Sequence, residues 1–248
     1  MSELLVVALG LGVGVSVGLT GVGGGSFLTP FLILVLRVHP GVAVATSLVF
    51  TLITRAVGSV QHLRQGTVDL KVVRQLAVGS LPAAVGSWLV LTHVVRASGS
   101  DEVRSRLIQV CLLIAAAVLT YRFFVPLRPG QGTNHPVKLA LLGVLIGAMV
   151  ALSSVGSGSV AVAGLIGLTS LPVARVVGTD MVHALILAAV AAPLALLQTP
   201  FDFHLAALLI AGSLPGVVIG SRLSVLVPER VTRFTVAVAV WTLALKVA

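Results

Sequence analysis

The sequence predicts an all-α, polytopic integral membrane protein built from two inverted repeats of five segments each. Its 248 residues are 57% hydrophobic and only 9% charged, with a mean hydropathy of +1.14, whereas a typical soluble chain is about 25% charged. Apolar stretches of about 20 residues, each long enough to span a bilayer, recur from end to end. Two glycine-rich breaks, at 21–26 and 154–159, interrupt this apolar chain at an offset of 133 residues.

Ten apolar segments follow one another along the chain. They cover 3–20, 27–37, 42–62, 70–93, 105–125, 137–153, 159–169, 173–197, 203–226 and 231–247. Two of them, 27–37 and 159–169, are too short to span a membrane alone, because a helix rises only about 1.5 Å per residue. Each short segment follows one of the breaks. A break and its short segment therefore predict a discontinuous or re-entrant hairpin.

The two halves match at the same offset through much of their length. Gly10, Gly14 and Gly18 align with Gly143, Gly147 and Ala151, and Thr46-Ser47 align with Thr179-Asp180. The tetrapeptide Gly-Ser-Leu-Pro occurs at 79–82 and again at 212–215. Helices with small residues four apart pack closely in membranes, so we interpret these glycines as scaffold. The predicted repeats are residues 1–130 and 131–248, within one membrane domain.

The basic residues of the links predict the orientation of the halves, because cytoplasmic links are rich in Lys and Arg. The link at 63–74 carries three bases against Asp69, and the central link carries three bases without an acid. The link at 198–204 carries Asp202 and no Lys or Arg, which places it outside. The links at 63–74 and 198–204 occupy equivalent places in the two halves but lie on opposite sides of the membrane. Each half is therefore expected to contain an odd number of full spans, which gives the two halves inverted orientations. The link at 94–106 fits poorly, since it is basic yet falls outside.

Composition also excludes several classes of function. The net charge of +9 lies mainly in short links, which indicates membrane topology and lipid headgroup contact instead of nucleic acid binding. The only cysteine is Cys111, and no histidines have metal-ligand spacing, so we expect no metal and no cofactor. Ser16 lies in a Gly-x-Ser-x-Gly pattern but inside a membrane helix, without the strand–turn–helix context of a nucleophile. We therefore do not expect an enzyme.

The N-terminus lacks the basic region of a cleaved signal peptide, so the first segment is expected to be retained.

The breaks are the strongest candidates for a binding site. Backbone groups freed at membrane depth must be buried in protein or line a watery cavity, and paired breaks of this kind indicate a transporter's site. A short helix after each break would present free N–H groups and partial positive charge, which suit an anion. A simple packing bend is the alternative. The candidate binding residues in the breaks are Gly23, Gly24, Gly25, Ser26, Ser157, Gly158 and Ser159.

Polar residues inside the apolar segments add further candidates. Thr46, Ser47 and Thr179 could bind a ligand or bond to carbonyls one turn back. Asp180 and His183 share one helix face, and ionisable residues at this depth are functional candidates by default. Asp180 could carry a coupling proton or pair with a base such as Arg55. Arg55 could balance a substrate charge, but extension of its side chain to the cytoplasmic surface is the preferred interpretation.

The motifs resemble one known family. The stretch Gly-x-Gly-Gly-Gly-Ser-Phe-Leu-Thr-Pro at 21–30, Ala45-Thr46-Ser47, and Gly58-Ser-x-x-His62-x-x-x-Gly66-x-Val-Asp69 look like the TauE/SafE family of sulfite and organosulfonate exporters. The resemblance covers nearly the whole chain. It implies transport of sulfite, thiosulfate, sulfonates or related small anions across the inner membrane. In this chain Asp180 stands where the first half has Ser47, so the two halves of a site would not be equivalent.

These observations predict a secondary transporter of a small, sulfur-containing anion, with Asp180, helped by His183, linking transport to protons and Arg55 as a further gating candidate. An anion channel is the alternative, since it would use the same donors. Expected partners are the small inorganic or organic anion and membrane lipid, with no nucleic acid. A homo-oligomer is compatible with the sequence.

Overall fold

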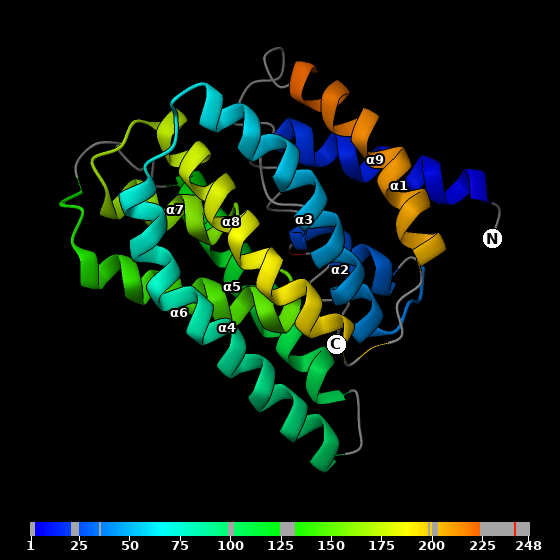
Figure 1. Cartoon of the computed structure of the whole chain (residues 1–248). Coiled ribbons are helices and arrows are strands. Elements are labelled where there is room, and N and C mark those ends of the chain that lie inside the picture. Colours follow the sequence, from blue (N-terminus) through cyan, green and yellow to red (C-terminus); the bar gives the residue numbers. More distant parts are fainter. Residues whose placement is uncertain are drawn as a thin grey trace.

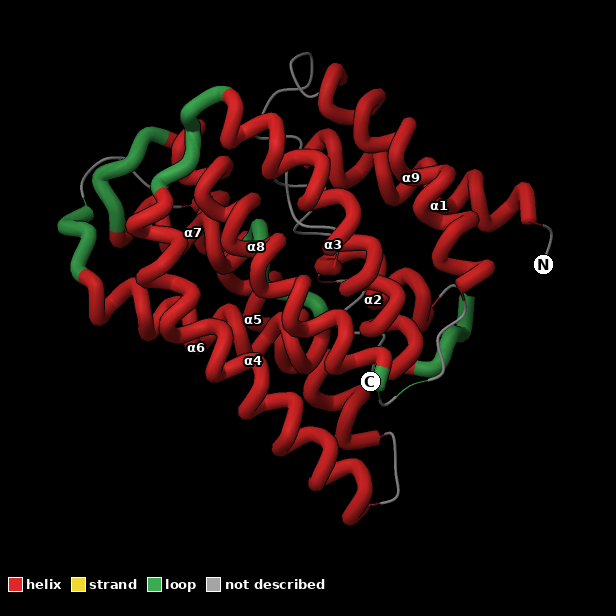
Figure 2. Tube along the Cα trace, in the orientation of Figure 1, coloured by secondary structure: helices red, strands yellow, loops and turns green. Residues whose placement is uncertain are grey.

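The described part of the chain consists of helices joined by short loops, without a strand (Figures 1 and 2). The structure, a computed structural model, describes residues 3–20, 25–34, 36–98, 102–124, 132–197, 199, 203–223 and 241. The helices of the first half are α1 (Glu3–Thr20), α2 (Gly25–Leu34), α3 (Pro40–Arg64), α4 (Leu70–Ser98) and α5 (Glu102–Phe124). Those of the second half are α6 (Pro136–Ser153), α7 (Val160–Leu168), α8 (Val173–Leu196) and α9 (Phe203–Leu223).

These helices coincide with nine of the ten predicted segments. Proline opens α3 and α6, where its missing N–H costs nothing. His39 caps α3 by accepting a hydrogen bond from the Gly41 N–H at 3.2 Å. The tenth predicted segment, 231–247, lies outside the described residues except for Trp241.

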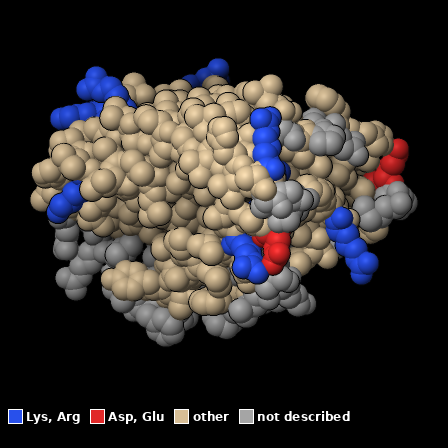
Figure 3. All heavy atoms as spheres, turned by 90° about the horizontal axis from the view of Figure 1, so that it is seen from below, with Lys and Arg blue, Asp and Glu red and all other residues tan. Residues whose placement is uncertain are grey.

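Five of the described helices, α3, α4, α6, α8 and α9, are long and apolar enough to cross a membrane. Their outer faces are apolar as well. Along α4, Val78, Val85 and Leu89 lie on one face and are exposed. Figure 3 shows one side of the molecule, on which charged side chains occur only at scattered points. An exposed apolar surface of this extent is stable against lipid, so the chain is a multi-pass membrane protein.

Glycines bring the two halves into close contact at two equivalent places. On α6, a Cβ added at Gly143 or Gly147 would overlap the carbonyl oxygens of Leu76 and Ser80 on α4. On α1, a Cβ added at Gly10 or Gly14 would overlap the carbonyl oxygens of the equivalent residues of α9, Leu209 and Ser213. The first helix of each half thus packs on the fourth described helix of the other half. Such a reciprocal exchange of contacts is the pattern that a two-fold relation produces.

The equivalent helices α3 and α8 pack against each other between these two pairs (Figure 1). α8 also packs on α4, and α6 leads into α7 through the second break. The largest hydrophobic cluster of the described residues surrounds this region, with Leu48, Leu112, Ile146 and Leu187 wholly buried. The contact of α3 with α8 is therefore the centre of the fold, and each helix comes from a different half.

The inverted orientation of the halves stays a prediction that cysteine labelling can test. Gln65 is exposed in the link after α3, and Gln198 is its counterpart at the offset of 133. In a Cys111→Ser background, we expect Gln65→Cys to react with an impermeant maleimide only from the cytoplasmic side and Gln198→Cys only from the outside. Labelling of both from one side would show parallel halves.

Candidate functional site

The second break is a buried, irregular turn between α6 and α7. Ser154 ends α6 in the left-handed conformation with φ 60°, and Gly156 and Gly158 have φ values of 124° and 84°. Residues with a Cβ rarely adopt such values, which explains the two glycines. All residues from 153 to 159 are buried. Backbone groups at this depth are tolerated only inside protein or against a polar ligand, so the predicted position of a binding site is consistent with the fold.

Serine hydroxyls in this break have no hydrogen-bond partner among the described residues. This applies to Ser154 Oγ and Ser159 Oγ. Ser159 occupies the N-cap position of α7, but its side chain makes no capping hydrogen bond. A buried hydroxyl without a partner costs about 1–3 kcal/mol. The break therefore presents polar groups that suit an additional ligand.

A buried polar stripe on α3 faces the second half. Ser47, Thr51, Arg55 and Ser59 follow at intervals of four residues, so they lie on one face of the helix, and all are buried. Ser59 Oγ donates a hydrogen bond to the Met181 carbonyl of α8 at 3.1 Å. Among the residues that the structure describes, the hydroxyls of Thr46, Ser47 and Thr51 have no partner, not even a carbonyl one turn back. The spacing of Thr51 and Ser59 is visible in the sequence, yet both were missed as candidates.

Arg55 is paired inside the protein, so the predicted extension of its side chain to the cytoplasmic surface is wrong. Its Nη1 lies 3.6 Å from Asp180 Oδ2 on α8, and the two side chains are only 7% and 2% exposed. A charge-assisted hydrogen bond would measure about 2.7–2.9 Å, so this pair is close but loosely engaged. Arg55 Nη2 and Asp180 Oδ1 have no hydrogen-bond partner in the described part of the chain. Packing of α3 on α8 leaves the arginine no path to the surface, and the alternative pairing with Asp180 is the one observed.

Asp180 also connects the polar stripe to the break. The backbone of Gly158 approaches its carboxylate. One acidic side chain is thus shared between the cation of the first half and the irregular backbone of the second half. The counterpart of Asp180 in the first half is Ser47, so the charged pair has no second copy at the equivalent position.

His183 lies one turn beyond Asp180 on the same face of α8. Its Nε2 is 2.8 Å from Ser80 Oγ on α4, and its Nδ1 has no partner within the described ranges. Ser80 belongs to the duplicated Gly-Ser-Leu-Pro motif, and its sequence context did not identify it as a site residue. Only the packing of α4 on α8 brings these two residues together.

Thr179 serves a structural contact, unlike Thr46 and Ser47. Its hydroxyl accepts a hydrogen bond from the N–H of Asp69 at 3.0 Å. Asp69 lies in the link between α3 and α4. The Asp69 carboxylate also lies 3.8 Å from Arg175. These contacts attach the link of the first half to the start of α8. The Thr179 hydroxyl accepts here and keeps its own proton for another contact, so a role in substrate binding stays a prediction.

The first break is described only at its end. Gly23 and Gly24 lie outside the described residues, and Gly25 and Ser26 form the start of α2, without a description of the Ser26 side chain. One turn into α2, the buried hydroxyl of Thr29 has no partner. Thr29 was not predicted as a candidate. α2 packs on α3, the helix that carries the polar stripe. A contribution of the first break to a site at this stripe stays a prediction.

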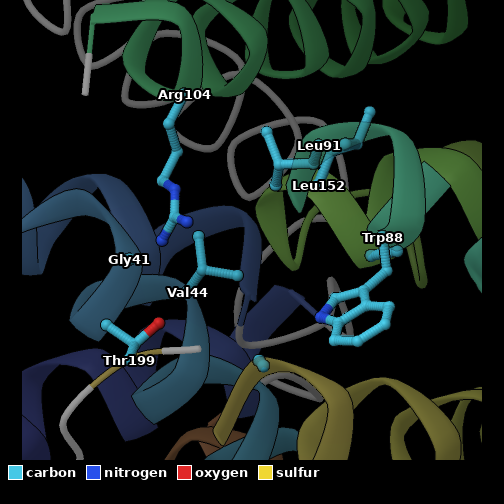
Figure 4. Close-up of a pocket in the computed structure, with 9 residues that line it drawn as sticks. Gly41, Val44, Trp88, Leu91, Arg104, Leu152 and Thr199 are labelled. Atoms are coloured by element: carbon cyan, nitrogen blue, oxygen red, sulfur yellow. The ribbon is translucent and has the colours of Figure 1, made fainter. Parts of the chain in front are cut away.

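A separate small cavity of about 20 Å³ lies near the start of α3 (Figure 4). Figure 4 shows Arg104 of α5 reaching toward Gly41, with Thr199 and Trp88 nearby. A Cβ at Gly41 would overlap the Arg104 guanidinium, so a larger residue there would have to displace the end of this side chain. The cavity is about large enough for one water molecule and does not include the Arg55–Asp180 pair.

Comparison with known proteins agrees with this architecture. The model of the family described as "Sulfite exporter TauE/SafE" matches residues 6–247. The chain is 38% identical to the "Probable membrane transporter protein YjnA" of Bacillus subtilis over 241 residues, 94% of each chain. It is 25% identical to the "Probable membrane transporter protein YdhB" of the same organism over 237 residues, 93% of this chain and 94% of the relative. No solved structure matches. The chain is thus a multi-pass membrane transporter that belongs to the TauE/SafE family.

Proposed function

We propose that this transporter carries a small oxyanion of sulfur, such as sulfite, thiosulfate or a sulfonate, across the inner membrane by secondary transport. The observation that carries the proposal is the buried Arg55, which holds a positive charge between the two halves with one amino group unpaired. Asp180 balances this charge only across 3.6 Å, and a buried charged group whose hydrogen bonds are incomplete is costly. An oxyanion supplies both the opposite charge and several hydrogen-bond acceptors.

The surrounding hydroxyls suit such a ligand. Thr46, Ser47 and Thr51 of α3 and Ser154 and Ser159 of the break are buried donors without partners. An anion leaving water loses several hydrogen bonds, and each donor replaces one of them. The partial positive charge at the start of α7 adds to the attraction, since a helix N-terminus favours negative charge. In this arrangement the anion binds between Arg55 and the break.

Charge balance links the anion to a proton at Asp180. Without substrate, Asp180 neutralises Arg55. An anion added to this pair would leave one uncompensated negative charge in the protein interior, which is expensive. Protonation of Asp180 removes that charge and releases Arg55 for the anion. The pair therefore predicts cotransport of one proton with each monovalent anion, and rocking of one half against the other would alternate the access.

Flux measurements in proteoliposomes test the proposal. We expect saturable uptake of labelled sulfite that is accelerated by sulfite on the opposite side and driven by a proton gradient. Thiosulfate, a sulfonate and chloride serve as competitors, with the oxyanions expected to inhibit and chloride expected to have little effect. A flux that is linear in the driving force, without saturation or counterflow, would indicate an anion channel instead.

A further inference from the structure

The contact between Ser80 and His183 lies beside the proposed anion site but has no role in it so far. Both side chains are 0% exposed, and Ser80 Oγ lies 2.8 Å from His183 Nε2. His183 shares one face of α8 with Asp180, whose carboxylate lies 3.6 Å from the Arg55 guanidinium. The other ring nitrogen, Nδ1, is buried without a partner.

The position of the imidazole proton follows from counting donors and acceptors. A neutral imidazole has one N–H and one acceptor nitrogen. Among the described residues, the one hydrogen-bond contact of the Ser80 hydroxyl is His183 Nε2. If Nε2 carries the proton, the Ser80 hydroxyl proton and Nδ1 both stay unsatisfied. If Nδ1 carries the proton, Ser80 donates to Nε2 and only the Nδ1–H is unsatisfied. The second tautomer is favoured, because each unsatisfied buried group costs free energy.

We propose that Ser80 is a positioning residue that holds the His183 proton on Nδ1, so that His183 offers a neutral N–H donor to the transported oxyanion. This inference rests on the proposed function. A neutral donor adds a hydrogen bond without adding charge, so the balance between Arg55, Asp180 and the anion is unchanged. In the favoured tautomer only the Nδ1–H lacks a hydrogen-bond acceptor, and the bound oxyanion would supply that acceptor.

The internal duplication supplies a matched control in Ser213. Ser80 and Ser213 are equivalent by the offset of 133 and are both buried. Each packs against a glycine of the other half, Gly147 for Ser80 and Gly14 for Ser213. Ser213 Oγ donates to the Ile210 carbonyl in its own helix at 3.1 Å, and the position equivalent to His183 is Phe50. Loss of the hydroxyl is therefore comparable in packing, but only Ser80 contacts a histidine.

The experiment compares Ser80→Ala and Ser213→Ala by sulfite transport and by ¹⁵N NMR of the histidine rings. We expect Ser80→Ala to raise the half-saturating sulfite concentration about tenfold, and Ser213→Ala to stay within about twofold of wild type. The wild-type His183 signal, assigned by its loss in His183→Gln, should show the proton on Nδ1. In Ser80→Ala the signal should change toward the other tautomer.

A double variant separates an effect through His183 from a general packing effect. In a His183→Gln background, Ser80→Ala should add less than about a twofold change, because the residue through which it acts is gone. Equal transport by Ser80→Ala and Ser213→Ala, or a wild-type proton on Nε2, would overturn the inference. The NMR result stands even where Ser80→Ala fails to fold. Absence of sulfite transport by the wild type would contradict the proposed function, which is a distinguishable outcome.

Discussion

Replacement of Arg55 by glutamine is expected to lower sulfite transport roughly 100-fold. The variant removes the buried cation, and a hydrogen bond to a charged group contributes about 1.5–3 kcal/mol, so the binding loss alone accounts for a factor of about 10 to 100. Arg55→Lys keeps the charge but not the planar guanidinium, so its transport should lie between that of wild type and Arg55→Gln. Initial rates in proteoliposomes over a range of sulfite concentrations measure the effect.

The same variant is expected to destabilise the protein, and a second substitution separates the two effects. In Arg55→Gln, Asp180 is left as a buried carboxylate without its cation, which costs about 3–5 kcal/mol. The double variant Arg55→Gln/Asp180→Asn has no charge at the site, and neutral replacement of a buried pair often costs little. We expect it to regain thermal stability in detergent but not transport. Recovery of transport together with stability would show that Arg55 is only structural.

Replacement of Asp180 by asparagine is expected to abolish the pH dependence of transport. Under the proposed mechanism, anion binding requires a proton on Asp180, so wild-type uptake should rise as the pH falls on the side from which the anion enters. Asparagine resembles the protonated carboxyl group and cannot release a proton. The test uses a sulfonate, because sulfite itself gains and loses a proton near neutral pH. The variant should therefore bind the sulfonate at every pH but should not use a proton gradient to accumulate it. Uptake at several pH values, with and without an imposed gradient, measures both properties.

Asp69→Asn is the matched control for this loss of a carboxylate. Asp69 Oδ1 accepts hydrogen bonds from the N–H groups of Lys71 and Val72 at the start of α4, and its carboxylate lies 3.8 Å from Arg175. Asparagine retains the capping oxygen, so we expect little change in folding and an unchanged pH dependence. If Asp180→Asn kept the wild-type pH dependence, or if Asp69→Asn removed it, Asp180 would not be the coupling residue.

The helices and the internal duplication were accessible from the sequence because their signals are local or repeated. Apolar length, prolines at helix starts and the offset of 133 predicted nine helices that the structure describes. The glycines at 10, 14, 143 and 147 were correctly interpreted as packing positions, since small residues four apart share one helix face. Asp180 and His183 were identified because ionisable side chains are rare in apolar segments.

The pairing of side chains across helices depended on the tertiary structure. Helical periodicity predicts which residues share a face, but it does not say which helix that face contacts. For this reason Arg55 was expected at the cytoplasmic surface, whereas it pairs with Asp180 on α8. Thr179 was expected to bind a ligand or a carbonyl one turn back, and the sequence did not reveal that its hydroxyl accepts from the Asp69 N–H. Ser80 was not identified, because its importance comes only from His183, 103 residues away.

The sequence by itself determined that the chain is a helical membrane protein with two related halves and a polar, glycine-interrupted interior. Those properties follow from composition, spacing and repetition, which the bilayer constrains strongly. Only the tertiary structure decided that the cation of one half meets the acid of the other between α3 and α8. That contact depends on the packing of helices far apart in the chain, and close packing at the glycine faces is what holds the two halves together.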